Sequence, residues 1–268
     1  MKSSVTGVAL LAFACAFVVG CMDCTLNAGE TRVAGNGHVV ESRRDIAGVT
    51  GVHLATFGDL KIQIGEREEF VIEAEDNLIE YIQTDVRGGT LRIETERGVS
   101  LKPKKKVRFY LTVKELDKVW ISSSGDIIAP YVETEKFDIR ISSSGDLVLK
   151  GVEATQVSIR LSSSGDADIG RVEARDLDIG ISSSGDVIIE DGTVRFQEIQ
   201  ISSSGDYNAE DVRSDNAEVS LSSSGDAHIH VDGKLNVSLS SSGSLYYSGD
   251  ATATISASSS GRARHVSH

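Results

Sequence analysis

The sequence has little proline, few aromatic residues and almost no cysteine. Its 268 residues include two prolines, three cysteines and one tryptophan, and aromatic side chains make up 5% of the chain. Three cysteines cannot build the dense disulfide framework that stabilises many small secreted domains. The fold must therefore be stabilised by an apolar interior and by hydrogen bonds.

Positive charge is also scarce. Lysine and arginine number 27 against 40 aspartates and glutamates, so the formal net charge is −13. Proteins that bind nucleic acid usually present an excess of basic side chains, so nucleic acid is excluded as the expected partner. The basic residues gather once, in Lys102–Lys106 and Arg108. This cluster either contacts phosphorylated lipid headgroups or an acidic partner, or forms a solvated loop before a strand.

The first 20 residues have the character of an export signal. One lysine is followed by an apolar run that is too short for a membrane span, which needs about 20 apolar residues. Val18-Val19-Gly20-Cys21 resembles a bacterial lipobox, in which the chain is cleaved before the cysteine and that cysteine is acylated. We therefore predict a lipid on Cys21; an ordinary secretory signal is the alternative.

The expected organisation has four segments. They are a lipoprotein signal peptide at residues 1–20, a lipid-anchored tether at 21–43, an N-terminal β section and cap at 44–115, and a repetitive β-helix at 116–268. An acylated Cys21 cannot form a redox pair with Cys24, so a Cys-x-x-Cys redox site is not expected. The predicted location is the bacterial cell envelope, on the periplasmic or surface face of the outer membrane, with the N-terminal lipid as the membrane contact.

A tetrapeptide, Ser-Ser-Ser-Gly, dominates the second half of the chain. Its glycine recurs at intervals of twenty and then eighteen residues, at positions 125, 145, 165, 185, 205, 225, 243 and 261. The period is too short for helical repeats, and no apolar spacing of 3.6 residues runs through it. Each copy is therefore expected to be one coil of a strand-based solenoid.

Apolar and polar residues alternate within each repeat. Odd positions from Phe137 to Leu149, including Ser143 and Gly145, are expected to face inward, and the same pattern recurs one coil later. A valine such as Val152 marks a second short strand, and the glycine lies where the chain bends sharply or adopts a positive φ. The predicted fold is an all-β, right-handed parallel β-helix with coils of 18–20 residues and an irregular N-terminal section.

An aspartate follows six successive repeat glycines. These residues are Asp126, Asp146, Asp166, Asp186, Asp206 and Asp226. They are expected to form an outward acidic row. Its members either serve as turn residues or share Ca²⁺ between neighbouring coils, since carboxylate oxygens are the ligands that calcium prefers. No metal ligand or other cofactor is assigned, and calcium stays a hypothesis for this row.

Catalytic chemistry finds little support in the sequence. A serine nucleophile needs one activated hydroxyl beside a base, whereas this chain has eight equivalent serine triplets and six histidines at spacings that suggest no pair. Polysaccharide-active β-helix enzymes cluster their acids, whereas these acids are spread evenly. Aromatic platforms for sugars are scattered: Trp120, Tyr131, Tyr207, Tyr246 and Tyr247. We expect no enzyme and no catalytic residues.

The chain resembles the auto-transporter adhesin head domain family, also called the GIN domain. The resemblance rests on Glu41-Ser42-Arg43, on Glu73–Leu78, on Gly88–Ile93 and on the repeated Ile/Leu-Ser-Ser-Ser-Gly-Asp. It implies a right-handed β-helix in cell-envelope lipoproteins, an adhesion role and no assigned catalytic residues. Fold alone does not identify a ligand.

The leading hypothesis is a lipid-anchored, non-enzymatic binding or adhesion module whose ligand is an unknown protein or glycan. The first alternative is a structural envelope protein that assembles into homo-oligomers through the solenoid ends, because an exposed strand edge invites pairing. The second alternative is a polysaccharide-active β-helix enzyme.

Overall fold

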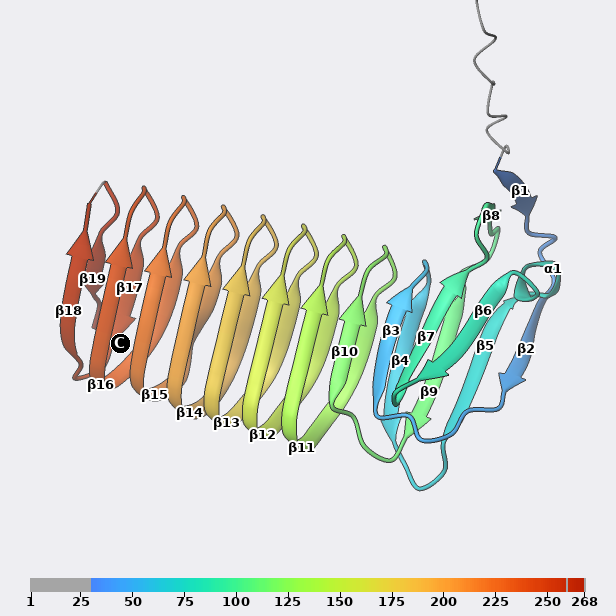
Figure 1. The fold of residues 1–268 in the computed structure, drawn as a ribbon, viewed down its shortest axis with the longest axis horizontal. Coiled ribbons are helices and arrows are strands. Elements are labelled where there is room, and N and C mark those ends of the chain that lie inside the picture. Colours follow the sequence, from blue (N-terminus) through green and yellow to red (C-terminus); the bar gives the residue numbers. More distant parts are fainter. Residues whose placement is uncertain (1–29, 259, 268) are drawn as a thin grey trace, which may run out of the picture.

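The structure is a computed structural model that describes residues 30–258 and 260–267. Six long strands stack side by side, each parallel to the next, in one continuous sheet (Figure 1). They are β11 (Ile127–Ile141), β12 (Leu147–Leu161), β13 (Ala167–Ile181), β14 (Val187–Ile201), β15 (Tyr207–Leu221) and β16 (Ala227–Leu239). The next coil is made of β17 (Leu245–Ser248) and β18 (Thr252–Ala257), and β19 (Ala263–His265) pairs with β17 and begins one more. The predicted right-handed parallel β-helix is confirmed.

The coils stack in strict register. Ile139 of β11 pairs with Ile159 of β12, which pairs with Ile179 of β13. Residues twenty apart in the sequence therefore become neighbours in space. The expected second short strand is not a separate element: Val152 lies within β12, which bends around the coil without interruption. Only the Ser-Ser-Ser-Gly-Asp segments leave the sheet, and they line one edge of the solenoid (Figure 1).

The predicted alternation of inward and outward residues is confirmed for the apolar positions. Phe137, Ile139, Ile141, Leu147 and Leu149 are at most 1% exposed. The middle serine differs, because it lies in a loop rather than a strand and is only half-buried. Its backbone carbonyl has a structural role instead: the carbonyl of Ser143 accepts a hydrogen bond from the N–H of Gly165 at 3.0 Å.

The repeat glycines are required by close approach of backbone, not by positive φ. Gly165 is not among the positive-φ glycines. A Cβ on Gly165 would lie 2.3 Å from the carbonyl oxygen of Gly145, and a Cβ on Gly145 would lie 2.2 Å from that of Gly125. Real Cβ atoms do not approach oxygen so closely, so the glycine stack sets how tightly the loops of adjacent coils can pack.

The N-terminal section extends the same sheet. Its elements are β2 (Val39–Arg44), β3 (Gly51–Ala55), β4 (Asp59–Ile64), β5 (Glu69–Glu75), β6 (Ile82–Arg87), β7 (Thr90–Thr95), β9 (Arg108–Val113) and β10 (Lys118–Ile121). β3 pairs in parallel with β10 and β4 with β11, so β3 and β4 form a coil directly beneath the first serine repeat. The chain then leaves this coil, builds the cap from β5 to β9, and returns in β10.

The first described residues belong to the fold. β1 (Thr31–Ala34) pairs with β8 (Val99–Lys102), and β2 pairs with β5, so residues before 44 take part in the described fold. A short helix, α1 (Asp76–Ile79), follows β5. None of the described helices is long and apolar enough to cross a membrane. The predicted signal peptide, Cys21 and Cys24 lie outside the described residues.

Candidate functional site

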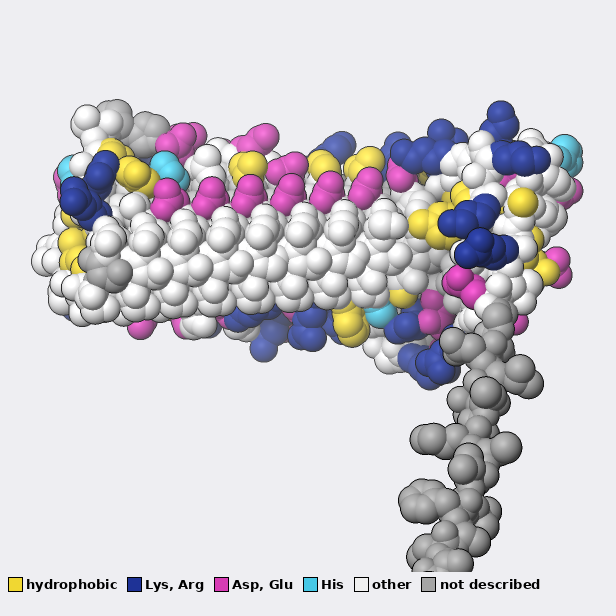
Figure 2. Space-filling model, turned by 90° about the horizontal axis from the view of Figure 1, so that it is seen from above, with side chains coloured by type: hydrophobic (Ala, Val, Ile, Leu, Met, Phe, Trp, Pro, Cys, Tyr) yellow, Lys and Arg dark blue, Asp and Glu magenta, His cyan; other side chains and the backbone are white. Residues whose placement is uncertain are grey.

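One edge of the solenoid presents a straight ridge of serine side chains. The first and third serines of repeats such as Ser162–Ser164 are exposed, and every coil contributes the same loop. Figure 2 shows the ridge as a continuous band along the molecule, with a row of acidic side chains beside it. Because each loop is hydrogen-bonded to the next through its backbone, the ridge is a rigid surface rather than a set of mobile loops.

The acidic row is the predicted aspartate row, and each member links two coils. The backbone N–H of Asp166 donates to Oδ1 of Asp146 at 2.9 Å, and that of Asp186 donates to Oδ1 of Asp166 at 2.8 Å. The same bond recurs from Asp126 to Asp226, where the last acceptor binds the N–H of Ser244. One oxygen of each carboxylate therefore satisfies a backbone donor that would otherwise lack a partner in the loop.

The calcium hypothesis stays a prediction. Within the part of the chain that the structure describes, no group of three or more His, Cys, Asp or Glu side chains has the arrangement of a metal site. The hydrogen bonds to the next coil give the aspartate row a role that needs no metal.

Apolar side chains lie on the far side of the aspartate row. Ile128, Val148 and Ile188 are 45%, 47% and 41% exposed, and they occupy equivalent positions in successive coils. Asp168 stands in the same row between Val148 and Ile188, where partial burial and the nearby carboxylates of Asp166, Asp146 and Glu190 raise its pKa. We call the serine ridge, the aspartate row and this apolar row together the lateral face.

A second feature lies where the N-terminal section meets the first repeat. It is a hollow of about 720 Å³ formed on β3, β6, β7, β10 and β11 and the turn after β7. We call it the arginine–tryptophan hollow. Its lining residues are His53, Asp85, Arg87, Thr90, Arg92, Glu94, Arg97, Lys118, Trp120 and Arg140. Five of these side chains are basic and two are acidic, in a chain whose net charge is −13.

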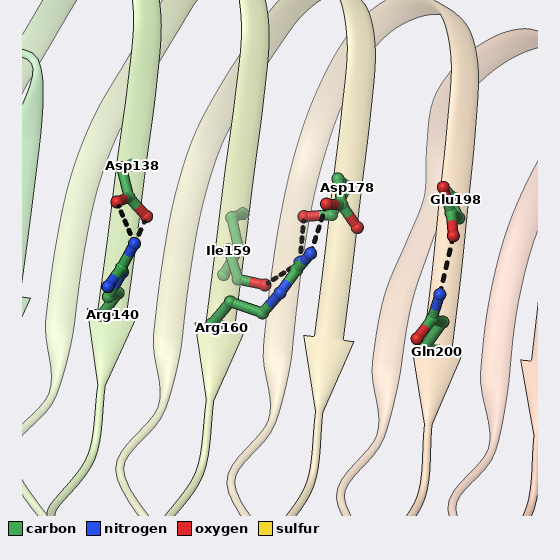
Figure 3. A network of polar contacts seen from close by, with 7 residues as sticks. All are labelled: Asp138, Arg140, Ile159, Arg160, Asp178, Glu198 and Gln200. Atoms are coloured by element: carbon green, nitrogen blue, oxygen red, sulfur yellow. Dashed lines mark hydrogen bonds and ion pairs between the residues drawn. The ribbon is translucent and has the colours of Figure 1, made fainter.

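Register explains why these residues meet. Arg92 of β7 pairs with His53 of β3, His53 pairs with Trp120 of β10, and Trp120 pairs with Arg140 of β11. Side chains at paired positions of parallel strands point to the same side of the sheet. The row continues to Arg160 of β12, whose guanidinium reaches the carbonyl of Asp178 at 3.1 Å and its carboxylate (Figure 3).

His53 is the buried centre of the hollow. Its ring stacks on Trp120 with the centroids 4.0 Å apart and the planes 7° from parallel. Burial, and then the positive charge of Arg92, lower the pKa of His53 to about 4, although Glu94 opposes the shift. Arg92 lies 3.1 Å from Nδ1, and since a guanidinium can only donate, Nδ1 is the acceptor. The proton of the neutral ring is therefore on Nε2, which donates to Oγ of Ser122 at 2.6 Å.

The expectation that no histidine pairs with a serine is wrong, but neither pair forms a working nucleophile. His53 contacts Ser122 through the protonated nitrogen, so it cannot take a proton from that hydroxyl. His230 lies between Ser248, at 2.9 Å, and Asp232, at 3.0 Å, which is the order of a hydrolytic triad. Ser248 is only 2% exposed, however, so a substrate cannot reach its hydroxyl.

The basic cluster of residues 102–106 and Arg108 is tied to carboxylates in part, through two ion pairs and two backbone hydrogen bonds. Lys106 pairs with Asp59, and Arg108 pairs with Glu73 at 2.6 Å. The backbone N–H groups of Lys104 and Lys105 donate to the buried carboxylate of Glu75. These contacts fit the reading of a loop before a strand, and the lipid and acidic-partner readings stay predictions.

The sequence reading missed the arginine–tryptophan hollow as a site. It named Trp120 only as one of several scattered aromatic residues, of which Tyr207 is fully buried and cannot serve as a platform. A signal was present: His53–Leu60 aligns with Trp120–Ile127, with Gly58-Asp59 in the place of Gly125-Asp126. That alignment would have placed His53 beside Trp120.

Comparison with known families gives one match over most of the chain. The family model described as "Putative auto-transporter adhesin, head GIN domain" matches residues 49–251. None of the curated proteins searched matches the sequence.

Solved structures share the fold. A crystal structure from Parabacteroides distasonis, described as a putative lipid binding protein, has a TM-score of 0.80 and 24% identity, and the match covers 88% of this chain and 100% of that one. A structure from Parabacteroides merdae, described as a putative adhesin, has a TM-score of 0.80 and 20% identity, with 88% and 99% covered. A putative adhesin from Bacteroides fragilis has a TM-score of 0.65 and 17% identity, with 87% and 100% covered. At these identities the likeness shows the shared fold.

The aspartate row predicts a contrast between two substitutions at Asp166. Asp166→Ala leaves the backbone N–H of Asp186 without its acceptor and should lower the free energy of unfolding by about 1 kcal/mol. Asp166→Asn keeps an Oδ1 acceptor and removes one of a row of like charges, so its stability should equal or exceed that of the natural chain. Urea unfolding at pH 7 measures both. Equal loss in the two variants would contradict the linking role, and a calcium-dependent rise in melting temperature that Asp166→Asn abolishes would assign metal to the row.

The lowered pKa of His53 predicts a pH dependence of stability. Unfolded histidine takes up a proton below about pH 6.5, whereas folded His53 stays neutral until about pH 4. The unfolded state therefore binds more protons between these values, and stability falls as the pH falls. The free energy of unfolding of the natural chain should exceed that of His53→Gln by a constant amount above pH 6.5, and this difference should decrease towards pH 4. Parallel stability profiles of the two proteins in urea titrations from pH 7.5 to 4.5 would contradict this.

Proposed function

Because the chain belongs to the family of auto-transporter adhesin head GIN domains, we propose that it is a non-catalytic binding module of the adhesion type, held at the bacterial cell envelope by a lipid on Cys21. The observation that carries the proposal is the lateral face, on which the same loop is repeated at constant spacing and fixed by backbone hydrogen bonds. The fold has no catalytic constellation open to a substrate among its described histidines and serines.

Rigidity favours binding by the lateral face. A surface that is already ordered loses little conformational entropy when a partner docks. A larger part of the favourable contact energy therefore remains in the free energy of binding. The exposed side chains of Ile128, Val148 and Ile188 supply apolar contact, and the serine and aspartate rows supply hydrogen-bonding groups beside them. Repetition adds a further gain, because one extended ligand can occupy several equivalent positions at once.

Anchoring by lipid is supported by the lipobox-like sequence that ends at Cys21. An extracytoplasmic location agrees with the adhesin-like family. The first described strand begins at Thr31, ten residues after this cysteine, so a lipid there would hold the N-terminal cap near the membrane and let the solenoid project away from it.

Substitution of the cysteines tests the anchor. The complete chain carrying Cys21→Ser should move from the membrane pellet to the soluble fraction of a bacterial host, and its mass should show no acyl group. Cys24→Ser is the matched control, because it removes a thiol three residues away and should leave the protein in the membrane fraction with its lipid. Retention of Cys21→Ser in the pellet with its acyl mass would contradict the proposal.

Bead retention tests adhesion through the lateral face. Beads coated with the protein should be retained under flow on at least one of four surfaces: mucin, collagen, fibronectin or bacterial cell-wall polysaccharide. Val148→Asn should reduce retention at least threefold, because the substitution removes a 47% exposed apolar side chain from the lateral face. Ile64→Asn is the matched control, since Ile64 is 45% exposed in the N-terminal section and lies off that face.

Two results would overturn the adhesion proposal. One is retention no greater than that of uncoated beads on all four surfaces. The other is equal retention of Val148→Asn and the natural chain. The mass of the soluble protein, measured over a range of concentrations, serves as a control for self-association. A rising mass would favour the structural alternative, in which copies pair through the last coil, where Ile255 is 45% exposed.

A further inference from the structure

We propose that the arginine–tryptophan hollow binds an acidic oligosaccharide, with Lys118, Arg97 and Arg92 contacting its carboxylate or sulfate groups and Trp120 packing against a sugar ring. The volume of about 720 Å³ lies within the range of about 300–1,000 Å³ typical of small-ligand sites. The hollow meets the lateral face at Ser122, which His53 contacts, but none of its lining residues belongs to that face. This proposal therefore stands whether or not the lateral face mediates adhesion.

The charges of the hollow select for an anion. Arg87 and Arg92 are paired with Asp85 and Glu94 on their own strands. Lys118 and Arg97, by contrast, have no ion-pair partner among residues 30–258 and 260–267. Two unneutralised cations facing one hollow of an otherwise acidic protein leave a local positive field. Anionic groups of a ligand would complete the pairing of these two side chains.

The arginines are held in place before a ligand arrives. Arg92 is fixed by two contacts, its Nε to Glu94 at 2.8 Å and a terminal nitrogen to Nδ1 of His53 at 3.1 Å. Arg140 is fixed by Asp138 through contacts of 2.9 and 3.3 Å (Figure 3). A planar guanidinium whose direction is already set can bind a carboxylate or sulfate at a small entropic cost.

The tryptophan favours a ring-shaped ligand over a bare anion. His53 covers one face of the indole, and Trp120 is half-buried. The other face is directed towards the β11 side, and none of the rings or cations in the described part of the chain stacks on it. The C–H face of a pyranose packs well on such an aromatic surface. A neutral His53 supports this arrangement, since a protonated ring would repel the neighbouring cations.

A linear ligand also has room to extend. The outward row continues from Arg140 to Arg160 along the sheet, so a chain of sugars that starts at Trp120 would follow the coils. An oligosaccharide that runs in this direction would place one acidic group near Arg140 and the next near Arg160. An acidic oligosaccharide satisfies these three features together: a ring for the indole, anions for the free cations, and length along the row.

Trp120 provides a direct readout, because it is the only tryptophan of the chain. The intrinsic fluorescence of the protein should change saturably when a hexasaccharide of galacturonate or of heparin is added. Galacturonate carries carboxylates only, and heparin also carries sulfates, so the tighter of the two identifies the preferred anion. Neutral maltohexaose and the peptide hexaglutamate should bind at least tenfold more weakly.

Three variants locate the site. Lys118→Gln removes a cation that has no ion-pair partner and should weaken binding about tenfold, the loss expected for one charge-assisted contact. Arg195→Gln is the matched control, because it changes the net charge equally on an exposed strand position outside the hollow and should bind like the natural chain. Trp120→Leu, followed by calorimetry, should lose binding although every charge remains. Circular dichroism establishes that each variant is folded.

Several outcomes would overturn the proposal. They are the absence of binding by either acidic hexasaccharide at millimolar concentration, equal affinities of Lys118→Gln and Arg195→Gln, and unchanged binding by folded Trp120→Leu. Equal or tighter binding of hexaglutamate would also overturn it, because the hollow would then be a site for acidic peptides. None of these measurements depends on retention of the beads, so the two proposals can fail separately.

Discussion

A close backbone contact that recurs in every serine repeat fixes the other features of the solenoid. Each repeat glycine lies so near the carbonyl of the preceding glycine that a Cβ would be 2.1–2.5 Å from that oxygen in coils from Gly145 to Gly261. Only glycine fits, and it fits only when the loops are stacked in register. The register of the loops then determines which inward side chains meet, so Ile141 lies over Ile121 and under Leu161. A shift of one residue would bring apolar side chains to the surface along a whole strand.

Because of the same register, a hydrogen bond that is common in single turns is repeated along an extended surface. An aspartate that accepts a backbone N–H is a common device of isolated turns. Here the donor belongs to the next coil, as between Asp186 and Asp166, so the hydrogen bond that satisfies the loop also fixes the distance to the following aspartate. The serine, aspartate and apolar rows thus result from the stacking of the coils, and their side chains are spaced more evenly than side chains on separate loops would be. The like charges of the row are tolerated because they are exposed to water, where their repulsion is weak.

Sequence alone revealed the parts of the molecule that repeat. The Ser-Ser-Ser-Gly period and the alternation from Phe137 to Leu149 were sufficient to predict the coils and their interior. The half-buried middle serine was misassigned, because alternation was extended through a segment that leaves the sheet. The coil of β3 and β4 was not recognised as a neighbour of β10, because 52 residues lie between Gly65 and Lys118 in the sequence and the copy has Ala55-Thr56-Phe57 instead of the serine triplet. The contact between His53 and Ser122 was missed for the same reason. The contact between His230 and Ser248 spans one coil of eighteen residues, so the period could have revealed it.

Repetition also explains where a specific binding site can form. Every coil of the regular part has nearly the same loop, so the loop edge offers a repeated set of groups and not a unique one. A hollow lined by several different side chains forms where the repeat is interrupted. At the junction between β3 and β10, outward positions that carry Arg140, Arg160, Gly180 and Gln200 in the later coils carry His53 and Trp120. The β6–β7 hairpin adds Arg92 and its neighbours beside them, and a flat sheet becomes a hollow. The repeated part therefore suits broad, many-point contact, whereas selective recognition of one ligand has to be placed at the junction, as the arginine–tryptophan hollow is.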